Sequence, residues 1–107
     1  MISNLKNLGS TIKTLRTVAG YSQKEFAESI GISASGLSLI EKNLRDPSLS
    51  ILKSISNSLK IPVSVIITAS DQIPLDLDDK QREIYIKSQQ LLTDSMILMI
   101  QLNQANS

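Results

Sequence analysis

Side chains that can hydrogen-bond to phosphate and to base edges gather between residues 22 and 45 of this chain of 107 residues. Histidine and cysteine are absent from the sequence, which excludes the commonest general base, thiolate nucleophiles and thiolate metal sites. The chemistry that remains is that of hydroxyl, amide and cationic groups, which suits binding of a polyanion better than catalysis. We therefore expect a binding protein, with no cofactor and no metal, rather than an enzyme.

Five short helices are predicted for residues 1–68, because apolar residues recur there every three or four positions. Gly20 and Gly31 end the first two helices, whereas Ser48 and Pro62 introduce the last two. No β-hairpin signal competes, so the predicted class is all-α. The inward positions are Leu5, Leu8, Ile12, Leu15 and Ala19, then Phe26, Ala27 and Ile30, then Leu37 and Ile40, then Leu52, Ile55 and Leu59, and finally Val63, Ile66 and Ile67.

Residues 23–42, which read QKEFAESIGISASGLSLIEK, predict two helices joined by a three-residue bend. Ser22 can cap the first helix with Glu25 as its capping-box partner, while Tyr21 packs on Phe26. Ser33 repeats the capping signal in front of the second helix. This arrangement is typical of a helix-turn-helix, whose second helix enters the major groove of DNA.

The outer face predicted for that second helix is small and mostly polar. Small residues let a helix backbone approach base edges, serine hydroxyls can pair with any base, and a leucine can contact a thymine methyl group. The N–H groups at the starts of both helices suit phosphate oxygens. The candidate DNA-binding residues are Ser22, Gln23, Ser33, Ala34, Ser35, Ser38, Leu39, Lys42, Asn43 and Arg45.

Charge is divided unevenly along the chain, although the formal net charge is only +1. Residues 1–68 carry eight cationic and four anionic side chains, a net of +4, whereas residues 69–107 carry three and six, a net of −3. This asymmetry favours contact of the front alone with a polyanion. An excess of +4 and three aromatic residues are modest for a non-specific nucleic-acid binder, so sequence-specific binding is expected.

Residues 9–68 resemble the DNA-binding domain of the Cro/C1-type (XRE) family. The resemblance rests on QKEFAESIGISASGLSLIEK, on LRTVAGYSQKEFA at its start, and on IEKNLRDPSLSILKSISNSLKIPVSVII at its end. The pattern IEKN-x-x-x-PS is most similar to that of the Sin-type repressors. The resemblance implies a lambda-repressor-like bundle of five helices and a function as a dimeric transcriptional repressor or activator.

The resemblance also implies roles for single residues. Gln23 falls at a phosphate-contacting position, and Arg16 and Glu41 fall where the family often places a structural ion pair. Residues 34, 35, 38 and 39 fall on base-facing positions. Several relatives carry Gln, Lys or Arg early in this helix, where the present sequence has Ala34 and Ser35. Direct base readout is therefore expected to be sparse, with DNA shape and dimer spacing contributing more to specificity.

Residues 69–78 predict a linker, and residues 79–104 predict a helix that is capped by Asp78 together with Gln81. Its apolar surface is wider than a lone surface helix tolerates. We favour self-association of this helix over folding back on the bundle, because a helix-turn-helix usually needs two copies. The stripe comprises Ile84, Ser88, Leu91, Ser95, Leu98 and Leu102, is widened by Leu92, Met96, Ile97, Met99 and Ile100, and supplies the candidate dimerisation residues Ile84, Leu91, Leu92, Ser95, Leu98, Met99 and Leu102.

The expected function is that of a cytoplasmic transcriptional regulator that binds double-stranded operator DNA as a dimeric repressor. The alternative is an antitoxin or antagonist-controlled autorepressor whose C-terminal helix binds another protein. The start of the chain lacks a signal-peptide pattern, and the longest apolar run, residues 96–100, is too short to span a bilayer. We therefore expect no membrane partner.

Overall fold

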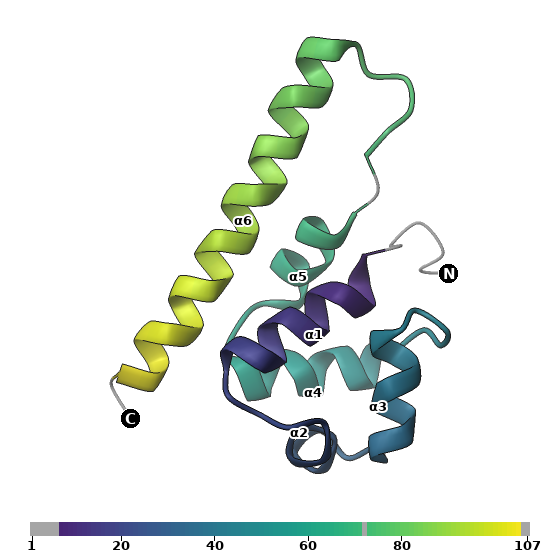
Figure 1. Cartoon of the computed structure of the whole chain (residues 1–107), viewed down its shortest axis with the longest axis vertical. Coiled ribbons are helices and arrows are strands. Elements are labelled where there is room, and N and C mark those ends of the chain that lie inside the picture. Colours follow the sequence, from purple (N-terminus) through teal and green to yellow (C-terminus); the bar gives the residue numbers. More distant parts are fainter. Residues whose placement is uncertain (1–6, 72, 106–107) are drawn as a thin grey trace.

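Six helices make up the computed structural model of the protein, which describes residues 7–71 and 73–105. The first five form a compact bundle, while the sixth runs along one side of it and projects beyond it (Figure 1). Every regular element in the described part of the chain is a helix, so the predicted all-α class is confirmed. The helices are α1 (Leu8–Val18), α2 (Gln23–Ile30), α3 (Ala34–Glu41), α4 (Leu49–Leu59), α5 (Val63–Ser70) and α6 (Asp79–Ala105).

The predicted capping residues set the bounds of the helix-turn-helix. The Ser22 hydroxyl accepts a hydrogen bond from the Glu25 N–H at 3.0 Å, and the Glu25 carboxylate accepts one from the Ser22 N–H at 3.0 Å. Hydrogen bonds from Ser22, first from its backbone and then from its side chain, hold the pKa of Glu25 below its ordinary value. Gly31 ends α2 at a φ of +79°, where glycine escapes the steric cost of a Cβ. Ser33 then caps α3.

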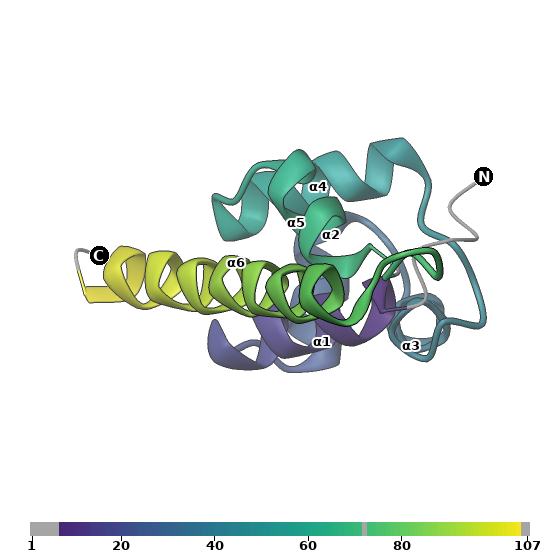
Figure 2. The ribbon, with the colours of Figure 1, turned by 90° about the horizontal axis from the view of Figure 1, so that it is seen from above.

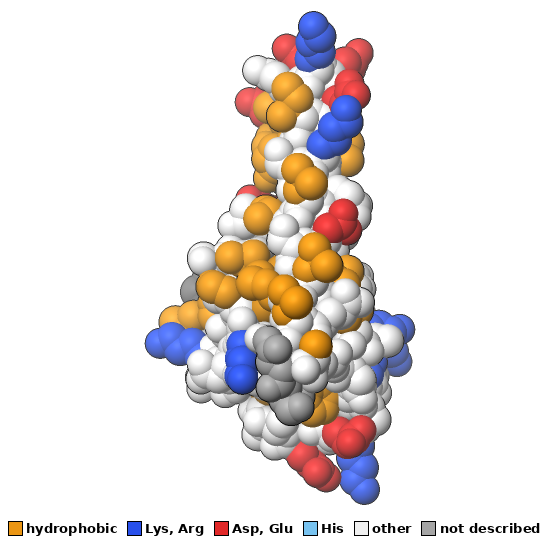
Figure 3. All heavy atoms as spheres, turned by 90° about the vertical axis from the view of Figure 1, so that its left-hand side faces the viewer, with side chains coloured by type: hydrophobic (Ala, Val, Ile, Leu, Met, Phe, Trp, Pro, Cys, Tyr) orange, Lys and Arg blue, Asp and Glu red, His pale blue; other side chains and the backbone are white. Residues whose placement is uncertain are grey.

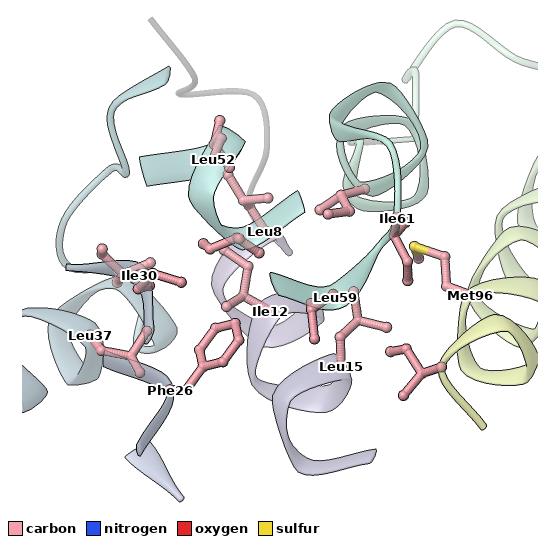
Figure 4. Packing of buried hydrophobic residues seen from close by; sticks show 14 of the residues in the cluster. Leu8, Ile12, Leu15, Phe26, Ile30, Leu37, Leu52, Leu59, Ile61 and Met96 are labelled. Carbon is pink, nitrogen blue, oxygen red and sulfur yellow. The ribbon is translucent and has the colours of Figure 1, made fainter. Parts of the chain in front are cut away.

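One apolar core is shared by all six helices (Figure 4). Ile12, Phe26 and Leu37, from three different helices, have no exposed surface, and burial of each contributes roughly 1.5–3 kcal/mol to stability. The Tyr21 and Phe26 ring centroids lie 5.4 Å apart, as the sequence predicts. Of the predicted inward residues, Ala19, Val63 and Ile67 are only half-buried against the core, and Leu5 lies outside the described residues.

The C-terminal half of α6 packs on the bundle, over the junction between α1 and α5 (Figure 2). The exposed fractions of Met96 and Ile100 are 0% and 3%, and both residues belong to the common core. The preference for self-association over folding back is therefore wrong for this face of the helix. The physical reason is that α6 has two apolar faces, and the face that includes Met96 and Ile100 covers core that α1 and α5 would otherwise expose to water.

Polar contacts fix α6 on either side of this apolar contact. The Gln89 side-chain amide donates to the Asp71 carbonyl oxygen at 2.5 Å, and that of Gln104 donates to the Ala19 carbonyl oxygen at 2.6 Å. Burial, and then the neighbouring Asp71 carboxylate, raises the pKa of the Tyr85 hydroxyl. These two hydrogen bonds, together with the buried Met96 and Ile100 between them, attach α6 to the bundle at three places along its length.

Two other findings concern the described residues alone. No single helix is long and apolar enough to cross a membrane, and α4 and α5 meet the length and composition test only as a pair bent by 106°. Both of these helices contribute to the buried core. Within residues 7–71 and 73–105, no group of three or more Asp and Glu side chains could hold a metal ion.

Candidate nucleic-acid interface

Helix α3 lies at the edge of the bundle with one face buried and one face free (Figure 1). Leu37 and Ile40 are 0% and 2% exposed and anchor the inner face. On the outer face Ala34, Ser35 and Leu39 are exposed and Ser38 is half-buried. The four base-facing candidates therefore do form one accessible surface, which is small apart from Leu39.

The hydroxyl groups of Ser33 and Ser35 form hydrogen bonds at the start of α3. The Ser33 hydroxyl accepts from the Gly36 N–H at 3.0 Å and lies 3.2 Å from the Ser35 hydroxyl. Ser33 is thus first of all a helix cap, and its oxygen is already engaged. Ser35 is exposed and keeps hydrogen-bonding capacity for a base or a phosphate, because among the described residues it bonds only to the Ser33 hydroxyl.

The Arg45 guanidinium lies near the same end of α3, although Arg45 follows that helix in the sequence. A Cβ built on the buried Gly36 would lie 3.7 Å from Arg45 Nη1 and 3.1 Å from Ser33 Oγ. The Arg45 side chain therefore reaches back along α3, so that its guanidinium lies near the start of the helix, and the residue is exposed. Lys42, the residue that ends α3, is also exposed. Both side chains are exposed, which the predicted phosphate contacts require.

A buried polar cluster holds the C-terminal end of α3. Arg16 and Glu41, the expected ion pair, join through Nε and Oε2 at 2.7 Å, with side chains that are 11% and 2% exposed. A second contact joins Nη2 and Oε1 at 3.2 Å, and Nη1 donates to the Tyr21 carbonyl oxygen at 2.7 Å. Every charged group in this cluster is thus hydrogen-bonded, which offsets the cost of its desolvation.

Gln23 belongs to this cluster as well. Its side-chain amide donates to Glu41 Oε1 at 3.0 Å, and the residue is half-buried. The sequence predicts a phosphate contact for this side chain, but in the structure its amide is hydrogen-bonded to Glu41 within the protein. Glu41 attracts it because the carboxylate has acceptor sites left over after binding Arg16. We call Arg16, Gln23 and Glu41 the brace, since they tie α1, α2 and α3 together.

A second attachment joins the end of α3 to the start of α1. The Asn43 side-chain oxygen accepts from the Gly9 N–H at 2.8 Å, and Asn43 has a φ of +60°. Asparagine tolerates this left-handed conformation better than most residues. A Cβ on Gly9 would overlap the Ile40 carbonyl oxygen and lie 2.9 Å from that of Glu41. Asn43, a DNA-binding candidate, thus has an internal role that uses its oxygen.

Two features of this region have no counterpart in the sequence prediction. Gly9 is one, although a glycine among helix-forming residues near a helix start can mark a close backbone approach. Leu39, near the end of α3, and Leu44 and Leu49, which follow it in the chain, are 42%, 71% and 60% exposed. Periodicity could not identify the last two, because Leu44 lies in a loop and Leu49 is the first residue of α4, where a helical repeat has only begun.

Comparison with known proteins identifies the fold family. The sequence model of the helix-turn-helix family matches residues 12–66. The HTH-type transcriptional regulator SinR of Bacillus licheniformis is 37% identical over 70 residues, which cover 64% of this chain and 63% of SinR. SinR of Bacillus subtilis (strain 168) is 36% identical over the same length, with the same coverage.

A third relative, the HTH-type transcriptional regulator ImmR of Bacillus subtilis (strain 168), is 36% identical over 61 residues, which cover 57% of this chain and 48% of ImmR. The chain thus spans between about half and two thirds of the length of these relatives. No solved structure matches the chain significantly. The family match covers the whole helix-turn-helix, most of α1, all of α4 and the first half of α5. The chain belongs to the helix-turn-helix family of the Cro/C1 (XRE) type, similar to the Sin-type regulators.

Proposed function

We propose that the protein is a transcriptional regulator that binds specific double-stranded DNA sequences through the outer face of α3. The observation that carries this proposal concerns α3, which has a small accessible outer face and a C-terminal end that is held by a buried ion pair. A reading helix must present its side chains in a fixed orientation, since base contacts depend on distances of a few tenths of an ångström. The relatives named above are transcriptional regulators, which supports the same function.

Sequence readout would come from few side chains. Ser35 and Ser38 can donate to or accept from base edges, and Leu39 can contact a thymine methyl group. Ala34 would let the helix backbone lie close to the groove floor. Such a face makes no bidentate contact of the kind that Arg or Gln gives, so DNA shape would contribute a large share of the specificity.

Phosphate contacts would surround the reading face. Lys42 is exposed at the C-terminal end of α3, the guanidinium of the exposed Arg45 lies near Gly36, and the capped N-terminus of α2 presents backbone N–H groups beside Ser22. The Gln23 backbone can contribute there, although its side chain is engaged in the brace. Binding would therefore weaken as salt rises, by the amount that two or more phosphate contacts imply.

A second copy of the chain would complete the regulator. Ile84, Leu91, Leu98 and Leu102 are 59–67% exposed on α6. Full burial of each contributes roughly 1.5–3 kcal/mol, so covering the exposed two thirds on both copies yields on the order of 8–16 kcal/mol. Association costs about 4–15 kcal/mol, which is of the same size, so a stable dimer would need close packing of the two stripes. Such a dimer would occupy two half-sites about 34–36 Å apart and repress by blocking an operator in the cytoplasm.

The direct test is binding-site selection from random DNA with the purified chain. We expect enrichment of one short motif in a two-fold symmetric arrangement. Selection in which no motif is enriched would contradict sequence-specific regulation. A control chain with Ser64→Ala and Thr68→Ala, both exposed on α5, should enrich the same motif.

A second candidate function rests on the same exposed stripe. Its apolar side chains can equally receive a helix of another protein, which would make the chain an antagonist-controlled regulator or an antitoxin. The mass of the purified chain in solution discriminates between the two. A dimer favours the first function, whereas a monomer that forms a one-to-one complex with the product of a neighbouring gene favours the second.

A further inference from the structure

Helix α6 presents two apolar faces that point in different directions. Tyr85, Gln89, Met96 and Ile100 mark the face that packs on the bundle. The free stripe of Ile84, Ser88, Leu91, Ser95, Leu98 and Leu102 lies about 120° around the helix, at 100° per residue. Figure 3 shows a column of apolar side chains running down α6 towards the bundle. The bundle therefore leaves this stripe uncovered.

The stripe has the spacing of a coiled-coil seam. Its six residues follow one another at intervals of four, three, four, three and four, which is the a/d pattern of a heptad repeat. Large residues occupy four of these positions, and the small Ser88 and Ser95 occupy the other two. A partner helix must therefore fill two shallow places and accommodate four projecting side chains.

We infer that the stripe pairs with the same stripe of a second copy in an antiparallel orientation. In the register where Ser88 faces Leu98 of the other copy, Leu91 faces Ser95 and Ile84 faces Leu102. Each central layer then combines one large and one small side chain, which is the arrangement that fills an interface evenly. A parallel pair would instead stack Ser88 on Ser88 and Ser95 on Ser95, which leaves voids between the leucine layers.

Electrostatics support the same orientation. Antiparallel helices bring the positive N-terminal end of one dipole beside the negative C-terminal end of the other, whereas parallel helices align like ends. One contact opposes it, because Asp94 of each copy lies at the rim near the centre of the antiparallel pair. Asp94 is exposed and accepts a hydrogen bond from the Gln90 side chain at 3.0 Å, so water and salt screen this repulsion.

Disulfide cross-linking tests the inference, because the chain has no cysteine of its own. One variant carries Ser88→Cys, and a second, longer by a tag, carries Leu98→Cys. The two are unfolded together, refolded, oxidised and separated by size without reductant. We expect the mixed disulfide of the two variants to dominate and each variant alone to remain largely uncross-linked. Gln90→Cys, on the polar side of α6, serves as the matched control and should cross-link with neither.

Each outcome decides one point. Efficient cross-linking of each single variant with itself would overturn the inference in favour of a parallel pair. A monomeric mass, or a dimer that forms no mixed disulfide, would overturn it in favour of another surface. The inference rests on the proposed function, so binding to the selected DNA motif is measured on the same samples. Motif binding without the mixed disulfide refutes only the pairing, and the mixed disulfide without motif binding refutes only the DNA-binding function.

Discussion

The two ends of α3 are built in opposite ways. At its C-terminal end, Glu41 is buried against Arg16 and Gln23, and Asn43 is bonded to Gly9. At its N-terminal end Ala34 and Ser35 are exposed, and within the described residues the Ser35 hydroxyl bonds only to that of Ser33. We therefore propose that the buried end of α3 keeps the helix rigid, whereas its exposed outer face contacts DNA. Changes at the brace should lower stability, whereas changes on the reading face should alter DNA preference at constant stability.

The largest effect is expected for Glu41→Ala. This change leaves Arg16 charged, buried and without its carboxylate partner, which typically costs about 3–5 kcal/mol. Urea unfolding monitored by circular dichroism measures it. The double variant Arg16→Met with Glu41→Leu should be markedly more stable than the single variant, because it removes both charges. A single variant as stable as the native chain would show that the brace does not hold α3.

Gly9→Ala comes next. The new methyl group would overlap the Ile40 carbonyl oxygen, so α1 must shift away from the end of α3, at a cost of about 1–3 kcal/mol. Thermal unfolding measures the loss. Ser10→Ala, at the exposed neighbouring position, is the matched control and should leave the melting temperature nearly unchanged. Equal melting temperatures for the two variants would contradict the close approach of α1 and α3.

Arg45→Ala should weaken binding to all DNA sequences about equally. Losing one phosphate contact reduces the slope of log K against log salt concentration by about 1. Titrations of specific and random DNA across a salt series measure both quantities. Lys80→Ala, at the far end of α6 from α3 (Figure 1), provides the control. A change in sequence preference, rather than in overall affinity, would assign Arg45 to base readout instead.

The smallest effect concerns pH and the cap of α2. The folded-state pKa of Glu25 is lowered, so its contribution to stability is present above its unfolded pKa of about 4.3 and is lost as pH falls through the lower folded value. Glu25→Gln keeps a capping oxygen that does not titrate in this range. Unfolding at pH 7 and at pH 3 should show the native chain losing its advantage over this variant in acid. A constant difference between the two chains would contradict the cap.

Much of the fold follows from local signals. Ser22, Ser33, Ser48 and Asp78 each cap the helix that the sequence assigns to them. These signals act within four residues, so they can be recognised without knowing the tertiary structure. The outer face of α3 can likewise be predicted from nearby residues, because burial of Leu37 and Ile40 fixes which side chains turn outward.

The parts that escaped prediction depend on distant contacts. The bond from Gly9 to Asn43 joins residues 34 positions apart, and no local pattern marks it. The engagement of Gln23 by Glu41 likewise depends on how α2 meets α3. For α6, the sequence revealed its apolar residues but could not divide them into two faces, because that division depends on where α1 and α5 leave the core open.

The central claim is that α3 reads DNA with its outer face while its braced end keeps it rigid. The most direct measurement compares the native chain with a variant carrying Ser35→Ala, Ser38→Ala and Leu39→Ala, both for operator preference and for unfolding free energy. Discrimination between the selected motif and a mismatched site should fall by at least about 1–3 kcal/mol, and the unfolding free energy should change little, by about 0.5 kcal/mol per exposed site at most. Unchanged discrimination in a folded variant would contradict the claim.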